Sequence, residues 1–147
     1  MATNRRKPGA TEFVLDSSLT LAWYFQDQAD PYADAVAARF PAARATVPVI
    51  WPLEVANAVL TGERRRRSTE AQATQWLTYL GSLPIVVDDE ALQKAWSEVL
   101  SLARTQRLSA WDAACLEPAL RRGLPLATLD DKLKAAASAV GLPAFAP

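Results

Sequence analysis

Four acidic side chains lie where proteins with parallel sheets often bind ligands. Asp16 directly ends a short apolar run, and Asp130 comes shortly after another such run. Glu54 and Asp112 each fall in the first turn of an expected helix. Ligands of open parallel sheets bind beyond the carboxyl ends of the strands, so these positions are candidates for a shared site.

Each acid also has an ordinary structural explanation when it is taken singly. Carboxylates are stabilised at helix N-termini by roughly 0.3–1 kcal/mol, so Glu54, Asp112 and Asp130 are also candidates for capping or dipole interactions. Asp16 fits this explanation less well, because it abuts a buried strand, where an unpaired carboxylate is costly.

A cluster of these acids points to a metal ion. Two carboxylates 4 Å apart repel by about 4 kcal/mol at an effective dielectric constant near 20, so a cluster needs protons or a cation. Oxygen ligands suit Mg²⁺ or Mn²⁺. Such an ion activates water and stabilises charge on a phosphoryl group. The acids therefore favour metal-assisted hydrolysis of a phosphodiester.

The composition narrows the chemistry further. The chain of 147 residues has no histidine and one cysteine, Cys115, which excludes Ser-His-Asp and Cys-His catalysis, imidazole ligands and internal disulfides. Half of the residues are hydrophobic, and sixteen acidic residues balance sixteen basic ones, which argues against disorder. We find no membrane span or secretory signal, and we expect a cytoplasmic protein. Cys115 is expected in the core.

The order of the elements predicts an α/β fold. Short apolar strands are expected at residues 12–16, 45–49, 84–88 and 124–128, and a short fifth at 143–145. Helical segments alternate with them, so we expect one domain over residues 12–147: a three-layer α/β/α sandwich around a mostly parallel sheet of four to five strands. Residues 1–11 are expected to form a flexible basic tail.

Several details of the helices are also expected from local signals. Ser17 or Ser18 is expected to cap the first helix, Asp30 the second and Ser109 the helix that carries Asp112. A single helix is expected over residues 89–104, with Trp96 on its buried side, and Trp76 is expected in the core. Proline in a helix costs about 3 kcal/mol unless the helix kinks, so Pro118 leaves the helix beyond residue 117 in question.

The sequence resembles the PIN-domain family of metal-dependent ribonucleases and, within it, the short VapC-like toxins of toxin–antitoxin pairs. Four segments carry the resemblance, in order: FVLDSS at 13–18, PLEVANA at 52–58, LSAWDAA at 108–114 and LATLDDKL at 126–133. They span residues 13 to 133, nearly the whole chain. The fold implied by the family agrees with the α/β/α sandwich.

The resemblance also implies roles for individual residues. Asp16, Glu54, Asp112 and Asp130 would form the catalytic acidic pocket that binds Mg²⁺ or Mn²⁺, with Asp16 and Asp112 as the direct ligands. Asp131 is the alternative to Asp130 as the fourth acid of this pocket. The resemblance further implies that Ser18, Asn57 and Thr128 hold the carboxylates through hydrogen bonds.

An RNA substrate needs positive charge, and the basic residues are unevenly placed. Twelve of the sixteen are arginine, whose guanidinium suits phosphate. The largest run is a candidate RNA-binding segment, with a solvated helix end as the ordinary alternative; it comprises Arg64, Arg65, Arg66 and Arg67. With Arg104, Arg107, Arg121 and Arg122, it suggests a basic rim around an acidic pocket.

Protein partners are expected from the resemblance and from an aromatic patch. Trp23, Tyr24 and Phe25, together with Leu53, Val59 and Leu60, are candidates for a partner groove or a dimer face. The resembling toxins form homodimers and bind a cognate antitoxin. We therefore expect a homodimer with an antitoxin and an RNA substrate as partners, and no membrane.

Two alternatives remain open from the sequence. A receiver-like regulatory module would accept a phosphoryl group on Asp16, with Thr128 and Lys132 as its hydroxyl and lysine, although it lacks a paired acid beside Asp16. The other alternative is a catalytically inactive PIN-like scaffold that binds no metal.

Overall fold

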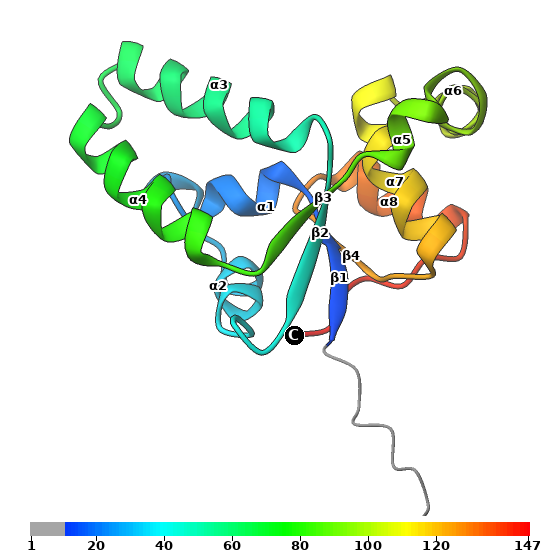
Figure 1. Ribbon diagram of the computed structural model, residues 1–147, viewed down its shortest axis with the longest axis horizontal. Coiled ribbons are helices and arrows are strands. Elements are labelled where there is room, and N and C mark those ends of the chain that lie inside the picture. The colour runs from blue at the N-terminus through cyan, green and yellow to red at the C-terminus, as the bar shows by residue number, and fades with distance from the viewer. Residues whose placement is uncertain (1–10) are drawn as a thin grey trace, which may run out of the picture.

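The structure is a computed structural model and describes residues 11–147 (Figure 1). Apart from Thr11, the expected basic tail of residues 1–11 lies outside the described residues. The strands are β1 (Glu12–Leu15), β2 (Arg44–Pro48), β3 (Ile85–Asp88) and β4 (Leu126–Ala127). The helices are α1 (Ser17–Ala22), η1 (Gln26–Gln28), α2 (Pro31–Ala37), α3 (Trp51–Arg64), α4 (Glu70–Ser82), α5 (Glu90–Gln93), η2 (Ala95–Val99), α6 (Leu100–Gln106), α7 (Ala110–Arg122) and α8 (Asp131–Ala139).

The four strands form one parallel sheet in the order β3-β2-β1-β4. β1 lies inside the sheet, where Val14 is paired with Thr46 of β2 and with Leu126 of β4. The expected α/β class and parallel sheet are confirmed. The expected fifth strand is reduced to one parallel bridge between Leu126 and Ala144.

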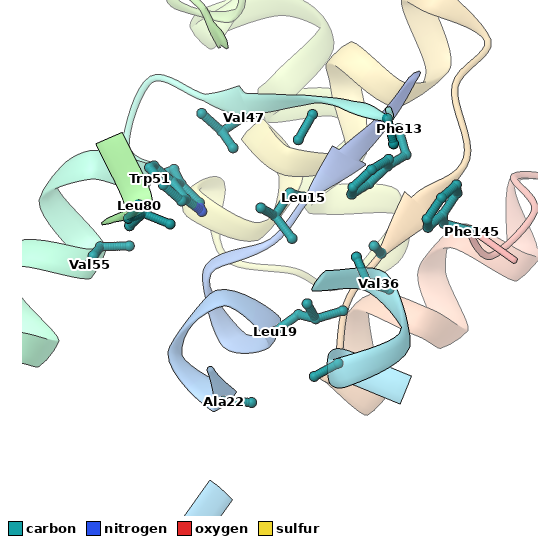
Figure 2. Packing of buried hydrophobic residues seen from close by; sticks show 14 of the residues in the cluster. Phe13, Leu15, Leu19, Ala22, Val36, Val47, Trp51, Val55, Leu80 and Phe145 are labelled. Carbon is teal, nitrogen blue, oxygen red and sulfur yellow. The ribbon is translucent and has the colours of Figure 1, made fainter. Parts of the chain in front are cut away.

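Helices cover both faces of the sheet, as a parallel sheet requires (Figure 1). Successive side chains of β1 point to opposite faces, so Phe13 and Leu15 enter one core and Val14 enters the other. The first core lies against α1, α2, α3 and α4, and Figure 2 shows Phe13 and Leu15 within it, with the ring of Phe145 stacked 4.1 Å from that of Phe13. The second core lies against α7 and α8. The expected three layers are present.

Local capping signals predicted most helix starts correctly. Asp30, Ser109 and Asp130 each accept a hydrogen bond from a backbone N–H in the first turn of α2, α7 and α8 respectively. The expectation for α1 was wrong: Ser17 and Ser18 lie inside the helix and Asp16 is its N-cap residue, without a side-chain capping bond. Both serine hydroxyls donate instead to carboxylates.

The expectation of a single helix over residues 89–104 was wrong, and the difference changes the exposure of Trp96. The chain turns at Lys94 between α5 and η2, a π-helical turn, before α6 continues. This interruption shifts the helical register, so Trp96 is 94% exposed rather than buried. Trp76, by contrast, packs against the first core as expected.

The helix that carries Asp112 continues beyond its internal proline. α7 extends through Pro118 to Arg122, so the helix does not end at the proline. Pro118 is itself fully buried, and its packing offsets part of the cost of the missing hydrogen bond.

No helix within residues 11–147 is both long and apolar enough to cross a membrane.

The aromatic patch at residues 23–25 packs against the first core, so only part of the expected partner surface is exposed. Phe25 and Val59 are buried, and Tyr24 stacks on Trp76 of α4 with ring centroids 4.6 Å apart. Trp23 donates its indole N–H to the Ala33 carbonyl at 2.7 Å. Of the expected set, only Leu53 and Leu60 remain exposed.

Candidate functional site

The fold carries the four predicted acids to the carboxyl end of the sheet. Asp16 follows β1 and Asp130 follows β4, the neighbour of β1. Glu54 lies in the first turn of α3, which follows β2, and Asp112 lies in the first turn of α7. Their charges act on one another: Asp16 and Asp112 raise the pKa of Glu54, and Asp130 and Asp16 raise that of Asp112. The structure therefore brings the four acids, here called the carboxylate cluster, into one neighbourhood.

Asp16 is the most constrained member of the carboxylate cluster. It is 8% exposed, and its Oδ2 accepts hydrogen bonds from Ser18 Oγ at 2.6 Å and Thr128 Oγ1 at 2.8 Å. The same hydroxyl oxygens accept the backbone N–H groups of Leu129 and Asp130, at 3.1 and 3.0 Å. This network joins the end of β1 to the start of α8 through Oδ2 of Asp16, and among residues 11–147 no donor reaches its Oδ1.

Glu54 is held by Ser17, a residue that was expected only as a helix cap. Ser17 Oγ donates a hydrogen bond to Glu54 Oε2 across a sequence separation of 37 residues. Burial, the largest effect, raises the pKa of Glu54; the Ser17 hydrogen bond lowers it, and the charges of Asp16 and Asp112 raise it. The sequence signal for Ser17 was its place directly after the strand-end Asp16.

Asp112 and Asp130 combine helix-start positions with membership of the carboxylate cluster. Burial, followed by the charges of Asp130 and Asp16, raises the pKa of Asp112, while a hydrogen bond with Ser109 and the charge of Lys132 lower it. Asp130 uses Oδ1 to accept the Leu133 N–H at 2.9 Å. Asp131 points outward, with its side chain fully exposed and Lys134 4.0 Å away, so of the two neighbouring acids Asp130 faces the cluster.

Asn57 does not hold a carboxylate, which corrects the expectation for this residue. It lies three residues beyond Glu54 on α3, about 4.5 Å further along the helix axis. Its side chain is exposed and makes no hydrogen bond with any of residues 11–147. Ser17, Ser18 and Thr128 are the hydroxyls that contact the cluster.

Cys115 lies one helical turn beyond Asp112 and is buried in the second core. Burial raises the pKa of its thiol well above the ordinary value, and the charges of Asp16, Glu54 and Asp112 raise it further. The thiol is therefore protonated and unreactive at neutral pH, as expected for a core cysteine.

The donors of the cluster fit a hard divalent cation in their chemistry. All four acids offer oxygen, the ligand type that Mg²⁺ and Mn²⁺ prefer, and burial and mutual repulsion raise the pKa of Glu54 and Asp112. A bound cation would relieve that repulsion. Within residues 11–147, no three acidic side chains lie close enough together to chelate an ion.

Several arginines of the expected rim are paired with acids or lie away from the cluster. Arg121 and Arg122 are engaged in ion pairs, with Asp88, Glu90 and Glu117 and with Glu12 respectively. Arg67 pairs with Asp27 at 2.7 Å, and its guanidinium lies 4.1 Å above the Phe25 ring. Arg64 lies ten residues beyond Glu54 on α3, about 15 Å along the axis. RNA contact by Arg64–Arg67 stays a prediction, but the run does not border the cluster.

A fold of this kind, with acids at the carboxyl end of a four-stranded parallel sheet, defines an α/β domain with an oxygen-donor site. A model of the PIN domain matches residues 13–139, and the chain belongs to the PIN domain family. This match gives no support to the receiver-like alternative. No curated protein matches the chain significantly.

Solved structures with similar folds include three whose match covers most of both chains. PAE2754 from Pyrobaculum aerophilum is 25% identical, with a TM-score of 0.63 and coverage of 86% of this chain and 80% of that chain. A toxin–antitoxin complex from Klebsiella pneumoniae is 18% identical, with a TM-score of 0.58 and coverage of 84% and 90%. FitAcB from Neisseria gonorrhoeae is 19% identical, with a TM-score of 0.51 and coverage of 92% and 97%.

The hydroxyls around Asp16 lead to a prediction for Thr128. Thr128→Val keeps the shape of the side chain but removes the donor to Asp16 Oδ2 and the acceptor of the Asp130 N–H. We expect the affinity for Mn²⁺ to fall about 10–100-fold, the usual cost of losing a group that orients metal ligands. Calorimetric titration of the metal-free proteins with Mn²⁺ measures the change. Asn57→Ala serves as the control, and equal affinities of Thr128→Val and the wild type would contradict the role of the hydroxyl.

The raised carboxyl pKa values predict a pH-dependent stability difference. Because the folded chain binds protons at Glu54 and Asp112 more tightly than the unfolded chain does, their contribution to stability falls as pH rises from about 4 through the raised pKa values. In excess chelator, Asp112→Asn should therefore have a Tm a few degrees above that of the wild type at pH ~7, and the gap should close toward pH ~4. Differential scanning calorimetry measures it. A variant that is less stable than the wild type at every pH would refute the prediction.

Proposed function

We propose that the protein is a divalent-metal-dependent endoribonuclease. The carrying observation is the carboxylate cluster, which gathers Asp16, Glu54, Asp112 and Asp130 at the end of the sheet in a chain without histidine. Members of the PIN domain family are typically nucleases, which supports hydrolysis of a phosphodiester over other uses of such a site. The resemblance of the four sequence motifs to VapC-like toxins supports RNA as the substrate.

In this proposal the carboxylates bind Mg²⁺ or Mn²⁺, with Asp16 and Asp112 as direct ligands. The bound ion would supply an activated water and offset charge on the phosphodiester. Ser18 and Thr128 fix the orientation of Asp16, and Ser17 fixes that of Glu54. Burial raises the pKa of Glu54, so this carboxylate is a better proton acceptor than an exposed one and is placed to orient or deprotonate the attacking water.

The nuclease proposal is tested by cleavage of single-stranded RNA with purified protein. We expect cleavage in Mg²⁺, no cleavage in excess chelator, and a strong loss of cleavage in Asp112→Asn. Equal rates under all three conditions would overturn the proposal, because neither the ion nor the acid would then contribute.

We further propose that the protein is the toxin of a toxin–antitoxin pair, acting in the cytoplasm as a homodimer that a cognate antitoxin neutralises. The similar fold in the toxin–antitoxin complex from Klebsiella pneumoniae supports this. Large apolar side chains that stand exposed, among them Leu53, Leu92, Trp96 and Trp111, are consistent with coverage by protein partners. We also propose that residues 12–147 form one domain, because β1 contributes side chains to the cores on both faces of the sheet.

The toxin proposal has a direct test in living cells. Induced expression of the wild-type chain without an antitoxin should arrest growth of the host, whereas Asp16→Asn expressed to the same level should not. Equal growth of the two strains would contradict the proposal.

A further inference from the structure

A groove lies between the turn that joins α6 to α7 and the side of α8. Its volume is about 510 Å³, within the range of ligand-binding clefts of roughly 300–1,000 Å³. Arg107 and Leu108 line one wall, and Lys132, Ala135 and Ala136 line the other. No acidic side chain of residues 11–147 lines it, so this space, here called the α6–α8 groove, is positively charged.

Both cations of the α6–α8 groove are free of ion pairs. Within residues 11–147, neither Arg107 nor Lys132 lies within 4.0 Å of a carboxylate oxygen, whereas Arg67, Arg121 and Arg122 are all paired. An arginine and a lysine that face one groove without an ion pair can both bind an anion there. The guanidinium fork matches the geometry of phosphate, and the lysine ammonium binds phosphate as a point charge.

Arg107 occupies a backbone conformation that glycine adopts more easily. Its φ of 54° and ψ of 43° are left-handed, and it ends α6 at the position where glycine or asparagine is the usual residue. The fold thus holds a long cationic side chain at a place where a smaller residue would be less strained. This is consistent with a role for the guanidinium in the groove.

The groove lies next to the carboxylate cluster. Lys132 lies in the first turn of α8, and Asp130 is the N-cap residue of that helix, so the two residues share the same end of α8. On the other wall, Leu108 leads directly into Ser109, the cap of the helix that carries Asp112. A chain of phosphates entering the groove would therefore pass beside the acids.

We propose that the α6–α8 groove binds the backbone of the RNA strand on one side of the cleaved bond, with Arg107 and Lys132 each contacting a phosphate. The proposal rests on the ribonuclease function proposed above and adds the path of the substrate. It keeps Arg107 from the basic rim expected from the sequence, adds Lys132, and leaves out the arginine run at the far end of α3. The alanine wall of α8 leaves room for the strand, and the free cations attract it without a requirement for particular bases.

The test measures binding of a fluorescein-labelled single-stranded RNA of mixed sequence by fluorescence anisotropy in Mg²⁺. All proteins carry Asp112→Asn so that the RNA stays intact. We expect Lys132→Gln and Arg107→Asn each to weaken binding by about 3- to 10-fold. Each should also reduce the slope of log affinity against log salt by about 0.7, the value for one lost phosphate contact on a single strand.

Two variants serve as matched comparisons. Lys134→Gln removes the same charge from α8, but Lys134 lies outside the groove and near Asp131. Arg66→Asn removes an unpaired arginine from the same left-handed conformation, with φ of 57°, at the end of α3. Asparagine tolerates this conformation, so both arginine variants should fold. We expect both comparison variants to bind RNA within about twofold of the parent.

The outcomes separate the groove from the proposed function. In the otherwise wild-type chain, the groove variants should raise KM for RNA cleavage several-fold and leave kcat within about twofold. Cleavage by the wild type with unchanged affinity and KM in both groove variants would overturn the groove and leave the nuclease standing. A loss in Arg66→Asn equal to that in Arg107→Asn would also overturn it, in favour of the arginine run. If the wild type cleaves no RNA in Mg²⁺, the proposed function fails, and the groove proposal fails with it.

Discussion

Asp16→Asn is expected to lower the rate of RNA cleavage by more than about 100-fold and to leave the fold intact. Loss of a group that merely orients a metal ligand costs 10–100-fold, and loss of a ligand exceeds that. The amide oxygen of asparagine can keep the hydrogen bonds from Ser18 and Thr128, which now reach Asp16 Oδ2. The amide NH₂ then takes the place of Oδ1, where it offers neither charge nor a lone pair to a cation.

Asp131→Asn is the matched control for this prediction. It makes the same chemical change at the fully exposed neighbour of Asp130, outside the carboxylate cluster. We expect its cleavage rate to stay within about twofold of the wild type, and circular dichroism should show both variants folded. If Asp16→Asn retains most of its activity, or if Asp131→Asn loses as much, the assignment of the pocket is wrong.

The second large effect that we expect is a loss of stability when Arg121 is replaced. Its guanidinium lies 2.8 Å from Glu117 Oε1, 2.8 Å from Asp88 Oδ1 and 3.1 Å from Glu90 Oε2. The Glu117 and Asp88 side chains are only 4% and 9% exposed. The hydrogen bond with Glu117 is the main cause of the raised pKa of Arg121. Arg121→Gln leaves two buried carboxylates without their cation, so we expect the free energy of unfolding to fall by about 3–5 kcal/mol.

Arg122 provides the comparison for Arg121. It pairs with Glu12 at 2.7 Å and donates to Thr46 Oγ1, but the two charged side chains are 36% and 28% exposed. Arg122→Gln should therefore cost about 1 kcal/mol or less. Urea denaturation of the three proteins measures both changes. Equal destabilisation by the two variants would show that burial of the carboxylates does not decide the effect.

Features encoded by neighbouring residues were predictable from the sequence. The apolar run before Asp16 predicted β1 and the position of this acid at the end of the strand, because burial and chain direction are local properties there. The caps at Asp30, Ser109 and Asp130 were predictable for the same reason. The parallel sheet followed from the alternation of short strands with helices.

Features that depend on distant contacts were not predictable in the same way. Ser17 was interpreted as a helix cap, because its partner Glu54 is 37 residues away. Arg121 was counted with the basic rim, because nothing in the sequence shows that Asp88 lies beside it. Tyr24 was expected on a surface that binds a partner, but Trp76 of α4 stacks on its ring. In each case, tertiary packing decides between two roles that the residue type alone allows.

The break at Lys94 is a further example. Apolar residues at helical spacing favoured one helix over residues 89–104, but a short π-helical turn interrupts it. A single residue of shift in register is enough to turn Trp96 from the core to the surface. Periodicity predicted that the segment is helical and failed to predict its buried face.

The most direct test of the central claim is titration of the metal-free protein with Mn²⁺ by isothermal calorimetry, alongside Asp16→Asn. The proposed site predicts saturable binding to the wild type and loss of that binding in the variant, because the proposal makes Asp16 one of the two direct ligands. A wild-type chain that binds no Mn²⁺ would contradict the account and favour an inactive PIN-like scaffold. Equal binding by the variant would show that the ion is held elsewhere.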